Sequence, residues 1–126
     1  MNLVLVFLGG GFGAVIRYLV GIGWVRLAGP GQPYMATAII NVTGSLIMGL
    51  LIGYLARLSG VSDRWRLLLG VGVLGGYTTF SSFSLEAVMM MERKAYGVAA
   101  AYIAGSALLG VLGLVLGLSL MRRLPL

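Results

Sequence analysis

A run of ten residues, Gly75 to Ser84, places two glycines and six hydroxyl side chains inside one of the most apolar parts of the chain. Two phenylalanines of this run, Phe80 and Phe83, are three residues apart and therefore share a helix face. An aromatic ring has a positive edge, so a ring presented edge-on favours a small anion without carrying a full charge. The hydroxyls and rings of this run therefore suit the binding or passage of an ion.

Few other polar side chains lie in the apolar parts of the chain. Thr37 and Asn41 are four residues apart, as are Tyr102 and Ser106, so each pair shares a helix face. Polar groups in hydrocarbon are costly and mark functional sites, but Ser, Thr and Asn also strengthen helix packing. Both interpretations are open for these residues. Arg17 either snorkels to a membrane interface or belongs to an anion pathway.

The inventory of reactive side chains excludes most chemistry. The 126 residues include no cysteine and no histidine, and the only acids are Asp63, Glu86 and Glu92. Thiolate and imidazole chemistry are therefore impossible, and we expect the chain not to be an enzyme. Glu86 is about 10 Å from Thr79 along a helix, so we expect no carboxylate at the centre of the run. With Arg17 as the one charge well inside an apolar segment, the lining favours an anion over a cation.

The elements that position these residues are membrane-spanning helices. Hydrophobic residues make up 60% of the chain and charged residues only 10%, against roughly 25% charged in a soluble domain. A membrane helix needs about 20 apolar residues, and the connectors are too short to separate two domains. We expect an all-α membrane protein with one domain over residues 1–126, packed as a solid bundle. Its four spans are Asn2–Trp24, Ala36–Leu55, Leu67–Met91 and Val98–Met121.

The third span is expected to be broken at its centre. Its midpoint is Thr79, and paired glycines such as Gly75 and Gly76 are a recognised cause of helix breaks. A break exposes backbone carbonyls, which is tolerated at membrane depth only inside protein or beside an ion or water. Transporters use such breaks as ion sites.

The charges that flank the spans give only a weak orientation. Four spans place five basic residues on one side of the membrane and three on the other. The chain therefore either inserts with its N-terminus inside or inserts both ways and pairs antiparallel. The five basic residues on one side are Arg57, Arg64, Arg66, Arg122 and Arg123, and the three on the other side are Arg26, Arg93 and Lys94. The net charge of +6 lies beside membrane spans, so we expect no nucleic-acid partner.

Glycines four residues apart recur along the chain and allow two helices to approach closely. They could serve packing within one subunit or between subunits. Because four packed helices leave no room for an aqueous channel, we expect any transport path to lie between subunits. The pairs are Gly9/Gly13, Gly49/Gly53, Gly72/Gly76 and Gly113/Gly117.

Taken together, these motifs resemble one family. Gly75-Gly-Tyr-Thr-Thr-Phe-Ser-Ser-Phe83, followed by Ser84-Leu-Glu86, is similar to the signature of the small bacterial fluoride channels, the Fluc or CrcB family. The resemblance extends over all four spans, and the one departure in the signature is Ser82, where threonine is usual. The other matching stretches are Gly10 to Tyr18, Thr37-x-x-x-Asn41-x-x-Gly44 and Tyr102-x-x-x-Ser106.

The resemblance implies a dual-topology, antiparallel homodimer in the bacterial cytoplasmic (inner) membrane, with two fluoride pores along the dimer interface. It implies passive export of fluoride and a structural sodium ion at the dimer centre, held by the backbone carbonyls of Gly75 and Thr78. It also implies that Phe80 and Phe83 line the pores and that Arg17 lies near an entrance. The polar contacts would come from Asn41, Tyr102, Ser106, Thr37, Thr79 and Ser81.

Two other classes of membrane protein remain as alternatives. A small multidrug-resistance-type exporter is also a four-span dual-topology dimer, but it needs a carboxylate in its first span. Here the first acid is Asp63. A membrane assembly subunit without a transport function would use its polar residues for packing alone and would tolerate their replacement.

Overall fold

The computed structural model describes residues 1–60 and 62–125, and all of its regular elements are helices. Four helical segments are long and apolar enough to cross a membrane, so the prediction of four spans is confirmed. The first two are α1 (Asn2–Ala28) and α2 (Pro33–Leu55), and the last is α6 (Tyr96–Arg123). Between them, the third segment consists of α3 (Asp63–Trp65), the π-helix η1 (Arg66–Leu74), α4 (Gly75–Tyr77) and α5 (Phe80–Glu92).

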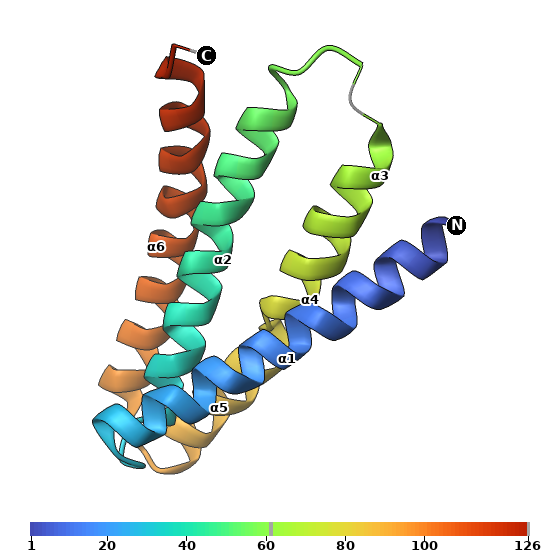
Figure 1. Ribbon diagram of the computed structural model, residues 1–126. Helices are drawn as coiled ribbons and strands as arrows, with labels where there is room; N and C mark the ends of the chain where they lie inside the picture. Colours follow the sequence, from blue (N-terminus) through green and yellow to red (C-terminus); the bar gives the residue numbers. More distant parts are fainter. Residues whose placement is uncertain (61, 126) are drawn as a thin grey trace.

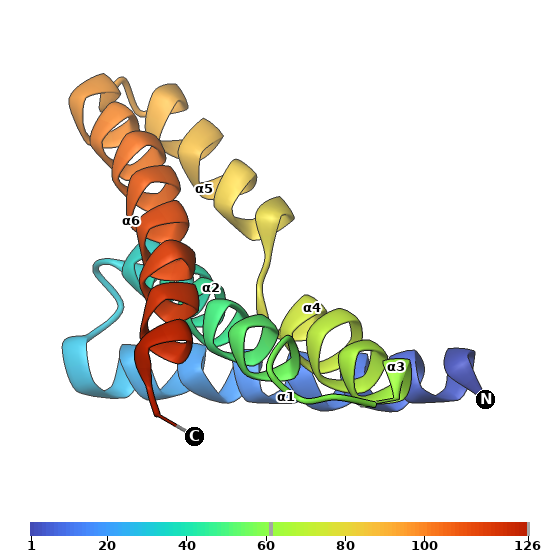
Figure 2. The same ribbon diagram turned by 90° about the horizontal axis from the view of Figure 1, so that it is seen from above.

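The helices form a splayed arrangement rather than the solid bundle expected from the sequence. α2 and α6 pack side by side over their lengths, while α1 packs against η1 and α4 (Figure 1). Seen from above, α5 and the first half of α6 extend away from the part of the molecule that contains α1, α3 and α4 (Figure 2). Among the described residues, no large side chain is fully buried. Space is therefore left between the helices of a single chain.

Glycine explains why the helices pack in these two pairs. All four of the predicted glycine pairs lie against another helix of the same chain, so packing within one subunit accounts for each of them. At Gly13 a Cβ atom would overlap the carbonyl oxygen of Val73, and at Gly49 it would overlap that of Leu114. These contacts with backbone atoms bring α1 against η1 and α2 against α6 at a separation that no larger residue permits.

The break in the third segment is present, but it begins at Thr78, two residues after the paired glycines. Gly75 and Gly76 are helical, whereas Thr78 and Thr79 are extended, with φ/ψ of −77°/155° and −148°/113°. A Cβ atom at Gly76 would overlap backbone atoms of Gly10, so this glycine serves helix packing. The expectation that the glycines themselves form the break is therefore wrong. The break falls where threonine side chains can bond the freed backbone.

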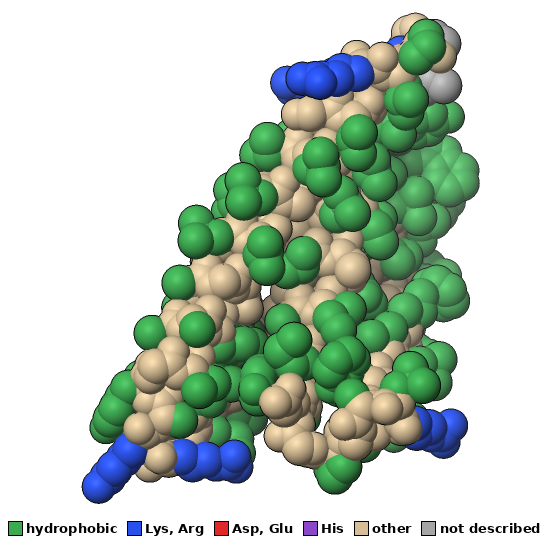
Figure 3. Space-filling view, turned by 90° about the vertical axis from the view of Figure 1, so that its left-hand side faces the viewer, with side chains coloured by type: hydrophobic (Ala, Val, Ile, Leu, Met, Phe, Trp, Pro, Cys, Tyr) green, Lys and Arg blue, Asp and Glu red, His purple; other side chains and the backbone are tan. Residues whose placement is uncertain are grey.

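The surface agrees with a membrane environment. Hydrophobic side chains cover the length of the molecule in Figure 3, and lysine and arginine side chains gather toward its ends. Beneath this surface, a small cluster of buried residues joins α5 to α6. Its members are Ala87, Met90, Ala99 and Tyr102, with Tyr34, Ala38 and Phe83 packed against them.

Candidate functional site

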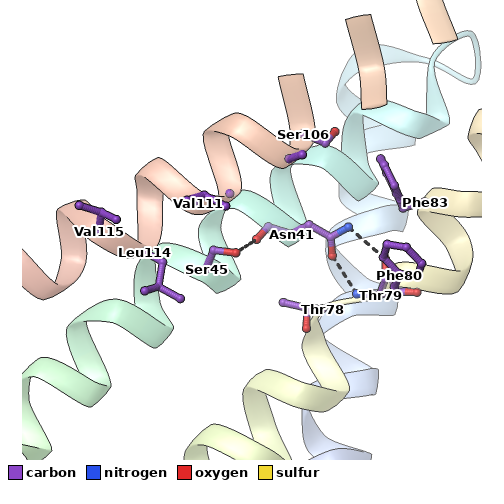
Figure 4. Close-up of a pocket in the computed structure, with 12 residues that line it drawn as sticks. Asn41, Ser45, Thr78, Thr79, Phe80, Phe83, Ser106, Val111, Leu114 and Val115 are labelled. Carbon is purple, nitrogen blue, oxygen red and sulfur yellow. Dashed lines mark hydrogen bonds between the residues drawn. The ribbon is translucent and has the colours of Figure 1, made fainter. Parts of the chain in front are cut away.

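Asn41 holds the break in the third segment. Its side chain reaches across from α2, where Oδ1 accepts a hydrogen bond from the backbone N–H of Thr79 at 2.8 Å and Nδ2 donates to the carbonyl of Thr79 at 3.0 Å (Figure 4). A single amide side chain thus pairs both backbone groups of one extended residue. In hydrocarbon such groups need partners within the protein, so Asn41 stabilises the break directly.

The hydroxyls of the break satisfy the helix ends on both sides. Thr78, the residue after α4, donates from Oγ1 to the carbonyl of Leu74, the last residue of η1, at 2.9 Å. Thr79 is the N-cap of α5, and its Oγ1 accepts from the amide of Ser82 at 3.2 Å. The same hydroxyl donates to Oγ of Ser82 at 3.1 Å and lies 3.4 Å from Oγ of Ser81. These threonine contacts are those of an N-capped helix start and a closed helix end, which is why the chain can break here.

The break leaves the carbonyls of the residues just before it without their helical partners, and the new partners of two of the missing donors are seen. In an unbroken helix the amide of Thr79 would donate to the carbonyl of Gly75, but here it donates to Asn41. The amide of Ser82 would donate to the carbonyl of Thr78, but here it donates to Thr79 Oγ1. The carbonyls of Gly75 and Thr78 are thus left without these donors. Oxygen ligands of this kind fit a hard cation such as sodium.

A cavity of about 460 Å³ opens beside the break, between α2, α5 and α6. Five of the nine predicted pathway residues line this cavity, which we call cavity 1. Asn41 and Ser106 face it from α2 and α6, with the two phenylalanines beyond them (Figure 4). The five are Asn41, Thr79, Phe80, Phe83 and Ser106.

The aromatic rings at cavity 1 form a connected series. The ring centroids of Phe80 and Phe83 are 5.6 Å apart with their planes tilted by 43°, and those of Phe83 and Tyr102 are 5.2 Å apart with a tilt of 38°. Tilted pairs at this distance are favourable because the edge of one ring approaches the face of another. Phe83 is half-buried, whereas 79% of Phe80 is exposed. Phe80 therefore has a large apolar surface without a partner in the single chain.

A second cavity, of about 660 Å³, lies between α1, α2 and the start of α5. Arg17 and Thr37 line this cavity, cavity 2, together with Ser82. Thr79 lines both cavities. The two spaces are therefore neighbours on either side of the break, and the predicted residues are divided between them.

Glu86 bonds two of the predicted pathway residues, although its position in the sequence places it away from the centre of the run. Thr37 donates to its Oε1 at 2.8 Å, and the hydroxyl of Tyr102 donates to its Oε2 at 2.6 Å. Tyr102 and Ser81 line neither cavity. Tyr102 contacts Phe83 through its ring and Glu86 through its hydroxyl. Glu86 follows Phe83 by three residues on α5, and that shared helix face was the available signal.

Fold and site together define a multi-pass α-helical membrane protein with a broken helix and a polar, carbonyl-rich break between two cavities. Residues 4–118 match the family described as "CrcB-like protein, Camphor Resistance (CrcB)". The chain therefore belongs to the CrcB family.

Named relatives cover nearly the whole chain. A protein of Caulobacter vibrioides (strain NA1000 / CB15N) is 50% identical over 123 residues, which are 97% of this chain and 96% of the relative. A protein of Phenylobacterium zucineum (strain HLK1) is 54% identical over 122 residues, or 96% and 95% of the two chains. Both relatives carry the name "Fluoride-specific ion channel FluC". Relatives that are ion channels confirm the expectation that the chain is not an enzyme.

Proposed function

We propose that the chain is a fluoride channel that lets fluoride leave the bacterial cytoplasm passively across the inner membrane. The observation that carries this proposal is the break held by Asn41 and flanked by the rings of Phe80 and Phe83, in a chain about half identical to fluoride channels. Cavity 1 offers the polar and aromatic groups that a small anion requires. An ion that enters it meets hydroxyl and amide donors and ring edges, with no acidic side chain in the lining.

The working unit in this proposal is a pair of antiparallel copies with two pores along their interface. Gly75 is exposed in the single chain, and so is most of Phe80. A carbonyl without its helical donor, as at Gly75, is tolerated at membrane depth only where protein or water covers it, so a second copy seated over this face would satisfy that requirement. The five-to-three distribution of basic residues supports insertion in both orientations.

A structural sodium ion at the centre of the pair belongs to the same proposal. The carbonyls of Gly75 and Thr78 would hold it from both copies, because their helical donors are engaged elsewhere. The positive charge of the ion would attract the carbonyl oxygens of both breaks and so hold the two copies together there. In the chain that the structure describes, no cluster of three acidic, cysteine or histidine side chains could hold a metal ion. Backbone carbonyls are therefore the appropriate ligands to consider.

Purified protein in liposomes tests the proposal. We expect rapid release of fluoride and very slow release of chloride, measured with ion-selective electrodes. Equal rates for the two anions would contradict fluoride selectivity, and no release of either would contradict a channel.

The aromatic rings are tested by Phe80→Ile and Phe83→Ile, which keep an apolar side chain but remove the ring edge. Each variant should cut fluoride flux severely while the oligomeric state stays that of the unmodified protein. Phe12→Ile is the matched control, because Phe12 is 61% exposed on α1 and lines neither cavity. Normal flux in both cavity variants would remove the rings from the mechanism.

A further inference from the structure

Cavity 2 has a strongly positive lining that the break and the aromatic rings do not explain. Two arginines of α1, Arg17 and Arg26, line it, and no acidic side chain does. The sequence alone counts Arg26 only as one of three charges on its side of the membrane. The structure adds that Arg26 lies in the wall of cavity 2.

The two arginines occupy different depths of cavity 2. Arg26 follows Arg17 by nine positions, which corresponds to about 13.5 Å and two and a half turns of a helix. Arg17 is half-buried near the middle of α1, whereas Arg26 is exposed in the last turn. At the inner end, the cavity reaches Thr79, which also lines cavity 1. Arg26 therefore lies at the outer rim of a space whose inner wall belongs to the break.

We propose that Arg26 attracts fluoride to the mouth of cavity 2 and so raises the rate at which the anion enters. This inference rests on the proposed channel function. A cavity lined by one sign of charge, with walls of low dielectric constant, focuses the electric field and raises the local concentration of the opposite ion. An exposed arginine at the rim does this without binding the anion tightly enough to hold it.

The effect has a characteristic dependence on concentration and salt. One unit charge at about 8 Å in a medium close to water enriches an anion roughly two- to fivefold. The enrichment matters while entry limits the current, and it disappears when fluoride saturates the pathway. Salt screens it, because the Debye length falls from about 10 Å at 0.1 M to about 3 Å at 1 M.

The test compares Arg26→Gln with the unmodified protein by fluoride conductance at several fluoride and salt concentrations. At low ionic strength and subsaturating fluoride, Arg26→Gln should conduct about two- to fivefold less, and the difference should vanish near 1 M salt or at saturation. Arg26→Lys keeps the charge and should behave like the unmodified protein. Arg93→Gln is the matched control, since Arg93 is exposed on the same predicted side of the membrane but does not line cavity 2.

The outcomes separate this inference from the function on which it rests. Equal losses in Arg26→Gln and Arg93→Gln would show a general surface-charge effect and overturn the inference, while the channel function stands. Arg26 also lies in the last turn of α1, where a cation stabilises the helix dipole. A loss that is the same at every salt and fluoride concentration would assign Arg26 to that structural function alone and overturn the inference. If the unmodified protein releases no fluoride, the proposed function itself fails.

Discussion

Replacing Asn41 with alanine should open the break in the third helix without disturbing the helices around it. Asn41 pairs both the N–H and the carbonyl of Thr79, at 2.8 and 3.0 Å. Leaving a buried backbone group unpaired costs about 1–3 kcal/mol. If the free energy that protects the Thr79 N–H falls by that amount, its hydrogen should exchange with water about 5- to 150-fold faster. Thr79 is itself buried, with 7% of its surface exposed, so water does not replace the lost partner freely.

Hydrogen exchange at the Thr79 amide, followed by mass spectrometry or NMR, measures this directly and does not depend on ion flux. Asn41→Asp keeps an acceptor for the Thr79 N–H but loses the donor to its carbonyl, so the amide should stay protected. Ser45→Ala is the control within cavity 1, because Ser45 donates only to the carbonyl of Asn41 one turn earlier in α2. Unchanged exchange at Thr79 in Asn41→Ala would refute the idea that Asn41 holds the break.

Two further predictions concern stability, measured as thermal unfolding in detergent. Gly13→Ala should destabilise the protein by at least about 1–3 kcal/mol, because its methyl group would overlap the backbone of Val73. The control is Gly11→Ala, whose methyl group would have no atom of another element within 4 Å, so this variant should be neutral or slightly stabilising. Equal effects of the two substitutions would contradict the packing argument. Lys94→Gly should stabilise the protein by about 1 kcal/mol, because Lys94 has a φ of 60° in the turn before α6, a left-handed conformation that costs less for glycine. A lower melting temperature of this variant would count against strain at Lys94.

The number and type of the spans could be predicted from the sequence because the length and apolarity of a membrane helix are set by the bilayer. Helix ends were less accurate. The first span was predicted to end at Trp24, but α1 continues to Ala28, and the last was predicted over Val98–Met121 but covers Tyr96–Arg123. Hydropathy marks the hydrocarbon region, whereas a helix continues as long as its backbone hydrogen bonds do. Basic side chains at a C-terminal turn even favour that continuation.

The position of the break shows where local reasoning fails. Paired glycines predict a weak helix, but Gly76 is fixed by its contact with Gly10 of α1, which is distant in sequence. The break falls instead at Thr78 and Thr79, where Asn41 from α2 supplies the missing backbone partners. Both interactions join different helices. A single segment read by itself contains neither of them.

Glu86 changes how the donors in the proposed pathway are counted. A hydroxyl has one hydrogen to donate, and Thr37 and Tyr102 each donate theirs to this carboxylate. Measured along one helix, Glu86 is remote from Thr79, yet α2 and α6 bring both hydroxyls to it. These two residues therefore position the carboxylate and do not offer a hydrogen to an anion while that bond lasts.

The same accounting narrows where fluoride would be held in the proposed pathway. Thr79 donates its hydroxyl hydrogen to Ser82, which removes another donor. An amide nitrogen has two hydrogens, and the recorded bond from Asn41 to the Thr79 carbonyl uses only one. The second hydrogen of Asn41 and the hydroxyl of Ser106 then supply the donors of cavity 1, beside the rings of Phe80 and Phe83. An anion with few strong donors and two aromatic neighbours is held weakly, which is what rapid passage requires.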